Sequence, residues 1–170
     1  MRVKNIMTTT NVACCNPGTN LAAAAEMLWI HDCGTLPVLD DIGRVLGVVT
    51  DRDICIALGT RDRKASELFA GDLLQPRLIT CDPEVEIGSA LKIMAAEQVR
   101  RLLVVDATET LQGVLCMSDI ILHSKRSGNG IGYEQVMETL KAICAPPGPA
   151  VEVETSLTGI ETHSALVAVA

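Results

Sequence analysis

Two kinds of hydrophobic pattern alternate along the chain, and they do so in the same order in both halves. In the first half, apolar positions recur at helical spacing from Leu21 to His31, and short apolar runs follow at 36–39 and 44–49. In the second half, the helical pattern covers Ile87 to Gln98 and an apolar run follows at 102–105. Each half therefore predicts a helix followed by two short strands.

A further strand is predicted before each of these helices. It covers Asn11–Cys14 in the first half and Arg77–Thr80 in the second, and a turn at Pro17 or Pro83 follows it. With the helix that follows the last strand, each half reads β-α-β-β-α. One such unit is too small to bury both its helix and its sheet faces, so we expect an α/β fold in which the two units pack together with pseudo-twofold symmetry.

The two halves are copies of one another, related by a constant offset. Gly113 lies 66 residues after Gly47, and no gap is needed between Cys15 and Ile54. The identical pairs are Cys15 and Cys81, Pro17 and Pro83, Ala24 and Ala90, Leu36 and Leu102, Val38 and Val104, Asp40 and Asp106, Gly47 and Gly113, Val48 and Val114, Asp53 and Asp119, and Ile54 and Ile120. The chain is a tandem duplication.

The junction between the last strand and the last helix is the best candidate for a binding site. In the first copy, Thr50 is a good N-cap, and Asp51 and Asp53 fall in the first helical turn. Free N–H groups at a helix start suit a phosphate, and a carboxylate suits the hydroxyls of a ribose. The structural alternative is a capping box between Thr50 and Asp53 that binds nothing. The repetition of the pattern at Asp119 favours a site.

The predicted boundaries follow the duplication. Residues 1–60 form the first repeat, and residues 61–126 contain a polar linker and the second repeat, with a short helix at Ala65–Ala70. Residues 127–170 contain a predicted helix at Tyr133–Cys144, which ends before a proline-rich stretch, and a flexible tail.

Composition narrows the class of protein. Apolar residues make up 48% of the chain but aromatic residues only 2%, so the core must be aliphatic. The net charge of −7 argues against nucleic acid or an anionic membrane as the main partner. Since there is no signal-peptide pattern and no apolar run of membrane-spanning length, we expect a cytoplasmic protein.

Metal binding and catalysis have little support in the sequence. The seven cysteines have irregular spacing and form no C-x-x-C pair, which favours buried thiols in a reducing compartment over a zinc site. His31 and Cys33 are neighbours, and a metal site would need further ligands from elsewhere. No nucleophile lies beside an ordered base, so we do not expect an enzyme.

The repeated motifs resemble a known family. The strands LPVLD and LLVVD, together with the junctions GVVTDRDI and GVLCMSDI, look like a pair of CBS domains, the cystathionine β-synthase-type module. The resemblance covers residues 3 to 124. The chain is similar to small stand-alone bacterial CBS pairs, including the hypoxic-response type. The resemblance implies a non-catalytic sensor that binds AMP, ADP, ATP, NAD or S-adenosylmethionine between the copies.

The same resemblance implies roles for residues of the first junction. Asp53 takes the position that holds the ribose hydroxyls, Thr50 takes the position that contacts phosphate, and Asp51 and Arg52 lie between them in the same candidate site. Residues near the first strand contact the adenine in the family, which here points to Val12 or, in the second copy, to the segment at 78–79. A plain core strand is the alternative for both segments.

The second junction departs from the family pattern. Asp119 keeps the ribose position, but Cys116 replaces the hydroxyl residue, and a thiol is a poor phosphate partner. Ser118 is a partial substitute. The sequence therefore predicts one intact cleft and one impaired cleft.

Basic residues directly before the LPVLD or LLVVD strand occur only in the second copy. Arg100 and Arg101 stand where relatives bind ligand phosphates, and their alternative is a surface ion pair with Glu97 or Asp106. In the first copy the matching position is Thr35, so a cation must come from elsewhere.

Two functions remain open at this point. The first is a regulatory module that senses an adenosine-containing ligand, requires no cofactor, forms a homodimer and acts on an effector protein that the sequence does not identify. The second is a structural or protein-interaction dimer whose ligand clefts are degenerate; the thiol at Cys116 and the missing cation at Thr35 favour it.

Overall fold

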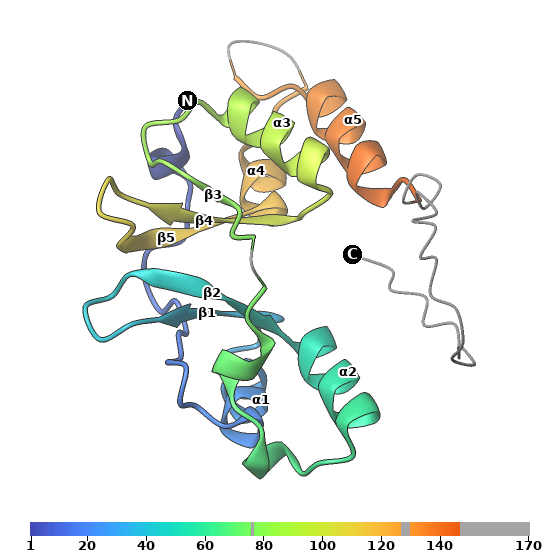
Figure 1. Cartoon of the computed structure of the whole chain (residues 1–170). Helices are drawn as coiled ribbons and strands as arrows, with labels where there is room; N and C mark the ends of the chain where they lie inside the picture. The colour runs from blue at the N-terminus through green and yellow to red at the C-terminus, as the bar shows by residue number, and fades with distance from the viewer. Residues whose placement is uncertain (76, 127–129, 147–170) are drawn as a thin grey trace, which may run out of the picture.

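The computed structural model describes residues 1–75, 77–126 and 130–146. In chain order its elements are η1 (Val3–Asn5), α1 (Leu21–Ile30), β1 (Thr35–Leu39), β2 (Val45–Thr50), α2 (Asp51–Arg61), η2 (Ala65–Glu67), η3 (Ala70–Leu73), β3 (Thr80–Cys81), α3 (Ile87–Glu97), β4 (Arg101–Val105), β5 (Leu111–Cys116), α4 (Met117–His123) and α5 (Tyr133–Cys144). The two sheets lie between the helices of repeat 1 and those of repeat 2 (Figure 1). No helix within the described ranges has both the length and the apolar character needed to cross a membrane.

The predicted helices are confirmed to within a residue or two at their ends. The Asn20 side chain begins α1 by accepting a hydrogen bond from the Ala23 N–H at 2.9 Å. Helix α3 ends where Gln98 adopts the left-handed conformation, with φ 51°. Helix α5 has the predicted bounds. Its apolar face and the proline-rich stretch after it are both local features of the sequence.

The sheets repeat the same register in both copies. Strands β1 and β2 are antiparallel, with Thr35 opposite Thr50, and β4 and β5 are antiparallel, with Arg101 opposite Cys116. Each pair has a β-bulge at the equivalent place, after Val38 in β1 and after Val104 in β4. The duplication therefore extends to the irregularities of the backbone.

The strand predicted at Asn11–Cys14 is wrong. Only Cys15 pairs with β1: its N–H donates to the Pro37 carbonyl, and its carbonyl accepts from the Leu39 N–H, both at 2.9 Å. The next rung of a parallel ladder would need the N–H of Pro37, which proline lacks. In repeat 2 the equivalent residue is Leu103, and there β3 pairs with β4.

The predictions around the linker were only partly right. The strand expected at Arg77–Thr80 begins at Thr80 and continues to Cys81. The helix expected at Ala65–Ala70 is instead two 3-10 turns, η2 and η3, separated by extended residues at Leu68 and Phe69. Segments this short are more often 3-10 than α-helical.

Each core includes a segment from the other side of the repeat boundary. Val3 and Ile6 precede repeat 1 but pack in the core of repeat 2, where Val3 is fully buried. Leu68 and Leu73 precede repeat 2 but pack in the core of repeat 1. Backbone hydrogen bonds fix both segments, from Ile87 N–H to Met1 and from Leu21 N–H to Leu68. The division at residue 60 describes the sequence repeats, and the packing crosses it.

A pseudo-twofold axis runs between the β2 and β5 hairpins. The Val45 N–H donates to the Glu109 carbonyl at 3.1 Å, and the Leu111 N–H donates to the Gly43 carbonyl at 3.2 Å. These two bonds are equivalent under the 66-residue offset, and Arg44 bridges to its own equivalent, Thr110. The repeats therefore meet through one contact whose two halves are related by a pseudo-twofold rotation.

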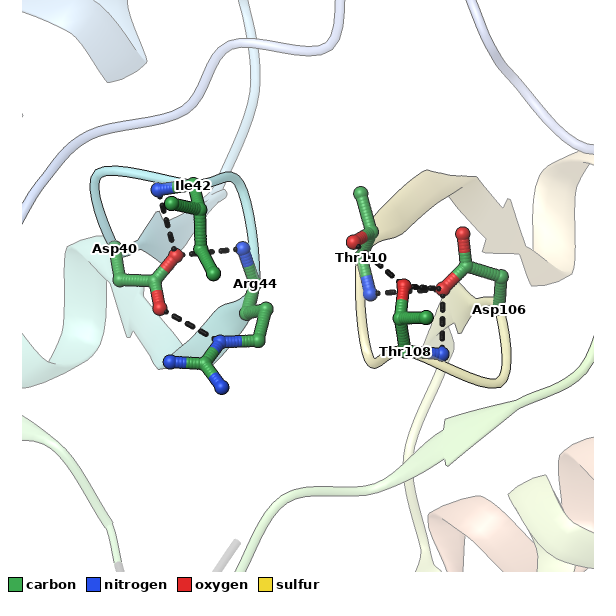
Figure 2. Close-up of polar contacts among 6 residues, drawn as sticks. All are labelled: Asp40, Ile42, Arg44, Asp106, Thr108 and Thr110. Carbon is green, nitrogen blue, oxygen red and sulfur yellow. Dashed lines mark hydrogen bonds and ion pairs between the residues drawn. The ribbon is translucent and has the colours of Figure 1, made fainter.

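An aspartate shapes the loop of each of these hairpins (Figure 2). The Asp40 carboxylate accepts hydrogen bonds from the Ile42 and Arg44 N–H groups at 3.1 and 2.8 Å. The Asp106 carboxylate accepts from the Thr108 and Thr110 N–H groups at 2.9 and 3.1 Å. Both are Asx-type turns, which gives this aspartate the same structural role in both copies.

Helix α5 packs on α3 and α4 (Figure 1). Val136 is buried, and Leu140 and Ile143 pack against the core of repeat 2. The predicted flexible tail lies beyond residue 146 and is outside the described residues.

Candidate functional site

The junction between β2 and α2 contains the two side chains on which the predicted site depends. The Thr50 hydroxyl donates to Asp53 Oδ2 at 2.7 Å, and the Thr50 N–H donates to the same oxygen at 2.9 Å. In return, the Asp53 N–H donates to Thr50 Oγ1 at 3.1 Å. Both are half-buried. The capping box is therefore real, and it holds the hydroxyl and the carboxylate together at the start of an 11-residue helix.

The junction between β5 and α4 is similar in backbone but different in chemistry. The Cys116 N–H donates to Asp119 Oδ2 at 2.8 Å, as Thr50 does to Asp53. Burial raises the pKa of the Cys116 thiol, the Asp119 carboxylate raises it further, and the positive charge of Arg101 lowers it in part. The thiol is thus protonated at neutral pH, and a protonated thiol is only a weak donor.

Arg101 connects the two repeats. Its Nη1 donates to the Thr35 hydroxyl at 3.2 Å, although it belongs to β4 and Thr35 begins β1. A Cβ built on Gly34 would lie 3.9 Å from Arg101 Nη2 and 3.5 Å from Asp51 Oδ2, so both charged groups approach this glycine. Since Thr35 is opposite Thr50 in the sheet, the guanidinium of repeat 2 lies beside the motif of repeat 1.

The alternative predicted for Arg100 and Arg101, a surface ion pair with Glu97 or Asp106, is wrong. Glu97 pairs with Arg77 at 2.6 Å, and the Asp106 carboxylate accepts from its own turn and from Gln112. Within the described ranges, neither Arg100 nor Arg101 forms an ion pair with these carboxylates. The cation that repeat 1 lacks at Thr35 comes from Arg101.

The other predicted site residues are not gathered by side-chain contacts in the described part of the chain. Arg52, Ser118 and Arg100 are exposed near their junctions, and the hydrogen bonds found for them use their own backbone atoms; the Arg52 N–H donates to Asp51 Oδ1 at 2.8 Å. Val12 is half-buried, and its carbonyl lies 3.4 Å from Cys14 Sγ. The structure thus brings together Thr35, Thr50, Asp51, Asp53 and Arg101, with Cys116 and Asp119 on the other side of the arginine.

Sequence reasoning missed that Arg101 and Thr35 would touch. They are equivalent positions, 66 residues apart, as Arg44 and Thr110 are. Residues near a twofold axis meet their own equivalents, so the offset was the signal that could have identified the pair.

Two of the cysteines, Cys15 and Cys81, are buried. Burial raises the pKa of both Cys15 and Cys81 to about 11, with a smaller contribution from a neighbouring thiol or carboxylate. Such thiols are unreactive at neutral pH. Within residues 1–75, 77–126 and 130–146, no three His, Cys, Asp or Glu side chains are grouped to hold a metal ion.

The repeated fold and its paired junctions match a known family model. The model of the CBS domain matches residues 3–60 and 70–126, one match for each repeat. These segments make up more than half of the sequence, so this chain belongs to the CBS domain family, as a tandem pair.

Curated relatives include small bacterial proteins. The chain is 31% identical over 135 residues to hypoxic response protein 1 of Mycobacterium tuberculosis, which covers 79% of this chain and 89% of the relative. It is 30% identical over 121 residues to the CBS domain-containing protein YhcV of Bacillus subtilis, covering 71% of this chain and 84% of the relative.

Solved structures share the fold. A crystal structure of hypoxic response protein I with two coordinated zinc ions superposes with a TM-score of 0.66 at 32% identity, covering 72% of this chain and 98% of that one. CBSX2 in complex with AMP gives a TM-score of 0.64 at 28% identity, covering 71% and 93%; CBSX2 is from Arabidopsis thaliana. CBS pair proteins, some of which have AMP or S-adenosylmethionine bound, are regulatory modules.

Proposed function

We propose that this protein is a non-catalytic regulatory module that senses an adenosine-containing ligand of the AMP, ADP, ATP, NAD or S-adenosylmethionine class. The ligand occupies the first junction: Asp53 holds the ribose hydroxyls, and Thr50 and Arg101 bind phosphate. The ligand is regulatory, and the fold needs no cofactor. We also propose that the protein is cytoplasmic and acts through an effector protein.

The contact between Arg101 and Thr35 is the observation on which this proposal rests. This contact supports the proposal because the guanidinium of repeat 2 lies near the start of α2, where the helix dipole favours an anion. Arginine binds phosphate bidentately, and its bond to Thr35 orients it beforehand. The Thr50 hydroxyl can rotate from Asp53 to a phosphate oxygen without a change in the backbone.

Several features support a homodimer that transmits the signal. Ile56 in α2 and Leu122 in α4 are equivalent positions, and they are 50% and 80% exposed. Ile121, next to Leu122, is also 45% exposed. Exposed apolar residues related by the pseudo-twofold suit a symmetric partner, which a second copy provides. A ligand that binds one arrangement of the repeats more tightly then shifts the dimer toward that arrangement.

The alternative is a structural or interaction dimer with degenerate clefts. The capping box favours it, because Thr50 and Asp53 already bind one another. The neutral thiol at Cys116 favours it for the second junction.

A thermal-shift panel separates the two functions. Each of the five ligands is added at millimolar concentration, with inorganic phosphate and GMP as controls. At about ten times its Kd, a ligand stabilises by about 1.4 kcal/mol, which raises the Tm by about 3–6 °C for a chain of this size. A shift with an adenosine ligand but with neither control supports sensing. No shift with any of the five supports the interaction dimer.

A further inference from the structure

The first turn of α2 carries a carboxylate that the second junction lacks. Asp51 is the first residue of α2, and it is exposed. Its equivalent under the 66-residue offset is Met117, which is only 4% exposed and packs in the core of repeat 2. Since the aspartates at Asp53 and Asp119 are common to both junctions, Asp51 adds a second carboxylate to the first junction only.

One oxygen of the Asp51 carboxylate is bound to the start of its own helix. Oδ1 accepts a hydrogen bond from the Arg52 N–H at 2.8 Å. The Asp53 N–H is also occupied, because it donates to Thr50 Oγ1 at 3.1 Å. A ligand phosphate that approaches this turn therefore meets N–H groups that side chains already use. The positive end of the helix dipole is also partly neutralised by Asp51 itself.

The other oxygen of this carboxylate lies on the side of Arg101. A Cβ built on Gly34 would be 3.5 Å from Asp51 Oδ2 and 3.9 Å from Arg101 Nη2. The three heavy atoms found nearest to that Cβ position all belong to Asp51 or Arg101. Because glycine has no side chain, nothing from residue 34 separates the carboxylate from the guanidinium.

A ligand anion that binds to Arg101 at this place must therefore lie beside Asp51. Arg101 Nη1 donates to the Thr35 hydroxyl, and Nη2 is the nitrogen that approaches Gly34. A phosphate bound to Nη2 has the Asp51 carboxylate as a neighbour of like charge. The repulsion grows with each further negative charge on the ligand, whereas a positively charged ligand is attracted.

We propose that Asp51 determines which adenosine ligands bind at the first junction, an inference that rests on the proposed function. Its carboxylate disfavours a chain of two or more phosphates, as in ADP and ATP. It thereby selects an adenosine ligand with at most one phosphate, such as AMP or S-adenosylmethionine. Arg101 and Asp53 provide the attraction, and Asp51 provides the discrimination against the wrong ligand.

Isothermal titration calorimetry with adenosine, AMP, ATP and S-adenosylmethionine tests this proposal. The buffer has low ionic strength and no magnesium, because salt screens exposed charges and Mg²⁺ binds phosphates. The parent protein should bind AMP at least about threefold more tightly than ATP. Asp51→Asn keeps an oxygen that can accept the Arg52 N–H, so the helix start is preserved. This variant should bind ATP about twofold to tenfold more tightly than the parent does, AMP with a smaller gain, and adenosine unchanged.

S-adenosylmethionine gives the opposite sign, since its sulfonium group is positively charged. Asp51→Asn should weaken its binding about twofold. If Asp51 only supported the local structure, its replacement would change the affinities for all four ligands in the same direction. Opposite changes for ATP and S-adenosylmethionine therefore identify an effect of charge.

Two matched variants separate the charge of Asp51 from its position. Asp62→Asn removes the same charge at the C-terminal end of α2, where φ is 48°, a conformation that asparagine tolerates. It should leave the ratio of AMP to ATP affinity as in the parent. Asp51→Glu keeps the charge at the junction and should keep the preference for AMP.

The results separate this inference from the proposed function. If AMP binds but Asp51→Asn leaves the ratio of AMP to ATP affinity unchanged, the inference is overturned and the sensing function stands. The same holds if the parent binds ATP at least as tightly as AMP. If none of the four ligands binds to the parent or to Asp51→Asn, the inference is overturned, and the thermal-shift panel decides whether the proposed function is overturned as well.

Discussion

The Arg101 guanidinium of repeat 2 donates to the Thr35 hydroxyl of repeat 1 at 3.2 Å, and the two residues are equivalent positions of the duplication. They meet because they lie near the pseudo-twofold axis. Two arginines there would repel one another, and two threonines would provide no cation. Divergence of the repeats at this one position gives a single positive charge, which contacts Thr35 on one side and Cys116 on the other.

Replacing Arg101 should weaken the binding of phosphorylated adenosine ligands. In Arg101→Met, the ligand with the largest thermal shift in the panel should bind at least tenfold more weakly, because a charge-assisted bond to phosphate contributes about 1.5–3 kcal/mol. Isothermal titration calorimetry measures this change. Arg100→Met is the matched control, since Arg100 is exposed and adjacent. Equal losses in the two variants would mean that only the general positive charge matters.

Replacing Asp53 should affect folding and binding, whereas replacing Asp119 should affect mainly folding. Each carboxylate accepts the N–H of the residue that caps its helix, so both Asp53→Ala and Asp119→Ala should lower the free energy of unfolding by about 0.5–2 kcal/mol. Only Asp53→Ala should also abolish the ligand-induced thermal shift. If Asp119→Ala abolishes the shift while Asp53→Ala keeps it, the assignment of the intact junction is wrong.

Restoring the hydroxyl at the second junction should improve its binding. Cys116→Thr replaces a neutral thiol with a hydroxyl at a position where the backbone already matches Thr50. We expect a second binding step in calorimetry that the parent protein lacks. Cys116→Ala removes the thiol without adding a donor and serves as the control. A second step in both variants would point to relief of crowding rather than to the hydroxyl.

Two equivalent glycines should differ in their tolerance of alanine. A Cβ at Gly113 would lie 2.6 Å from the Thr8 carbonyl oxygen, and Thr8 is held by two backbone hydrogen bonds to Val114. A Cβ at Gly47 would lie 2.7 Å from the end of the Leu74 side chain, which can move. Gly113→Ala should therefore cost about 1–3 kcal/mol in urea unfolding, and Gly47→Ala clearly less. Equal costs would show that the Thr8 segment yields as easily as a side chain.

The hairpin aspartates should make stability fall in acid. Hydrogen bonds from the Thr108 hydroxyl and N–H hold the pKa of Asp106 below its ordinary value. Asp40 shows the same direction, since the bonds from Arg44 and Ile42 outweigh partial desolvation of the carboxylate. A lowered folded-state pKa gives stability that is present above the unfolded-state pKa, near 3.9, and is lost as the pH falls through the folded-state value.

The double variant Asp40→Asn, Asp106→Asn tests this expectation. It should be less stable than the parent at pH 7, and the difference should shrink as the pH falls below about 4. Urea unfolding at a series of pH values measures the difference. A difference that stays constant down to pH 3 would show that the pKa values of these carboxylates do not change on folding.

The sequence alone determined the duplication and most of its elements. The 66-residue offset, the two strand-to-helix junctions and the bounds of α5 are local patterns of apolar spacing and capping. The capping box also followed from residue identity, and residue identity predicts that the junction at Cys116 is impaired. The failure at Asn11–Cys14 has a local cause as well, because Pro37 in the neighbouring strand removes one hydrogen-bond donor.

Only the tertiary structure decided which segments meet. Val3 packs in repeat 2 and Leu68 in repeat 1, Arg101 reaches Thr35, and α5 covers α3. Local patterns specify the apolar face of a segment but not the partner on which it packs, because every aliphatic core accepts such a face. The choice depends on how the two copies fit around their shared axis, and that is a property of the assembled fold.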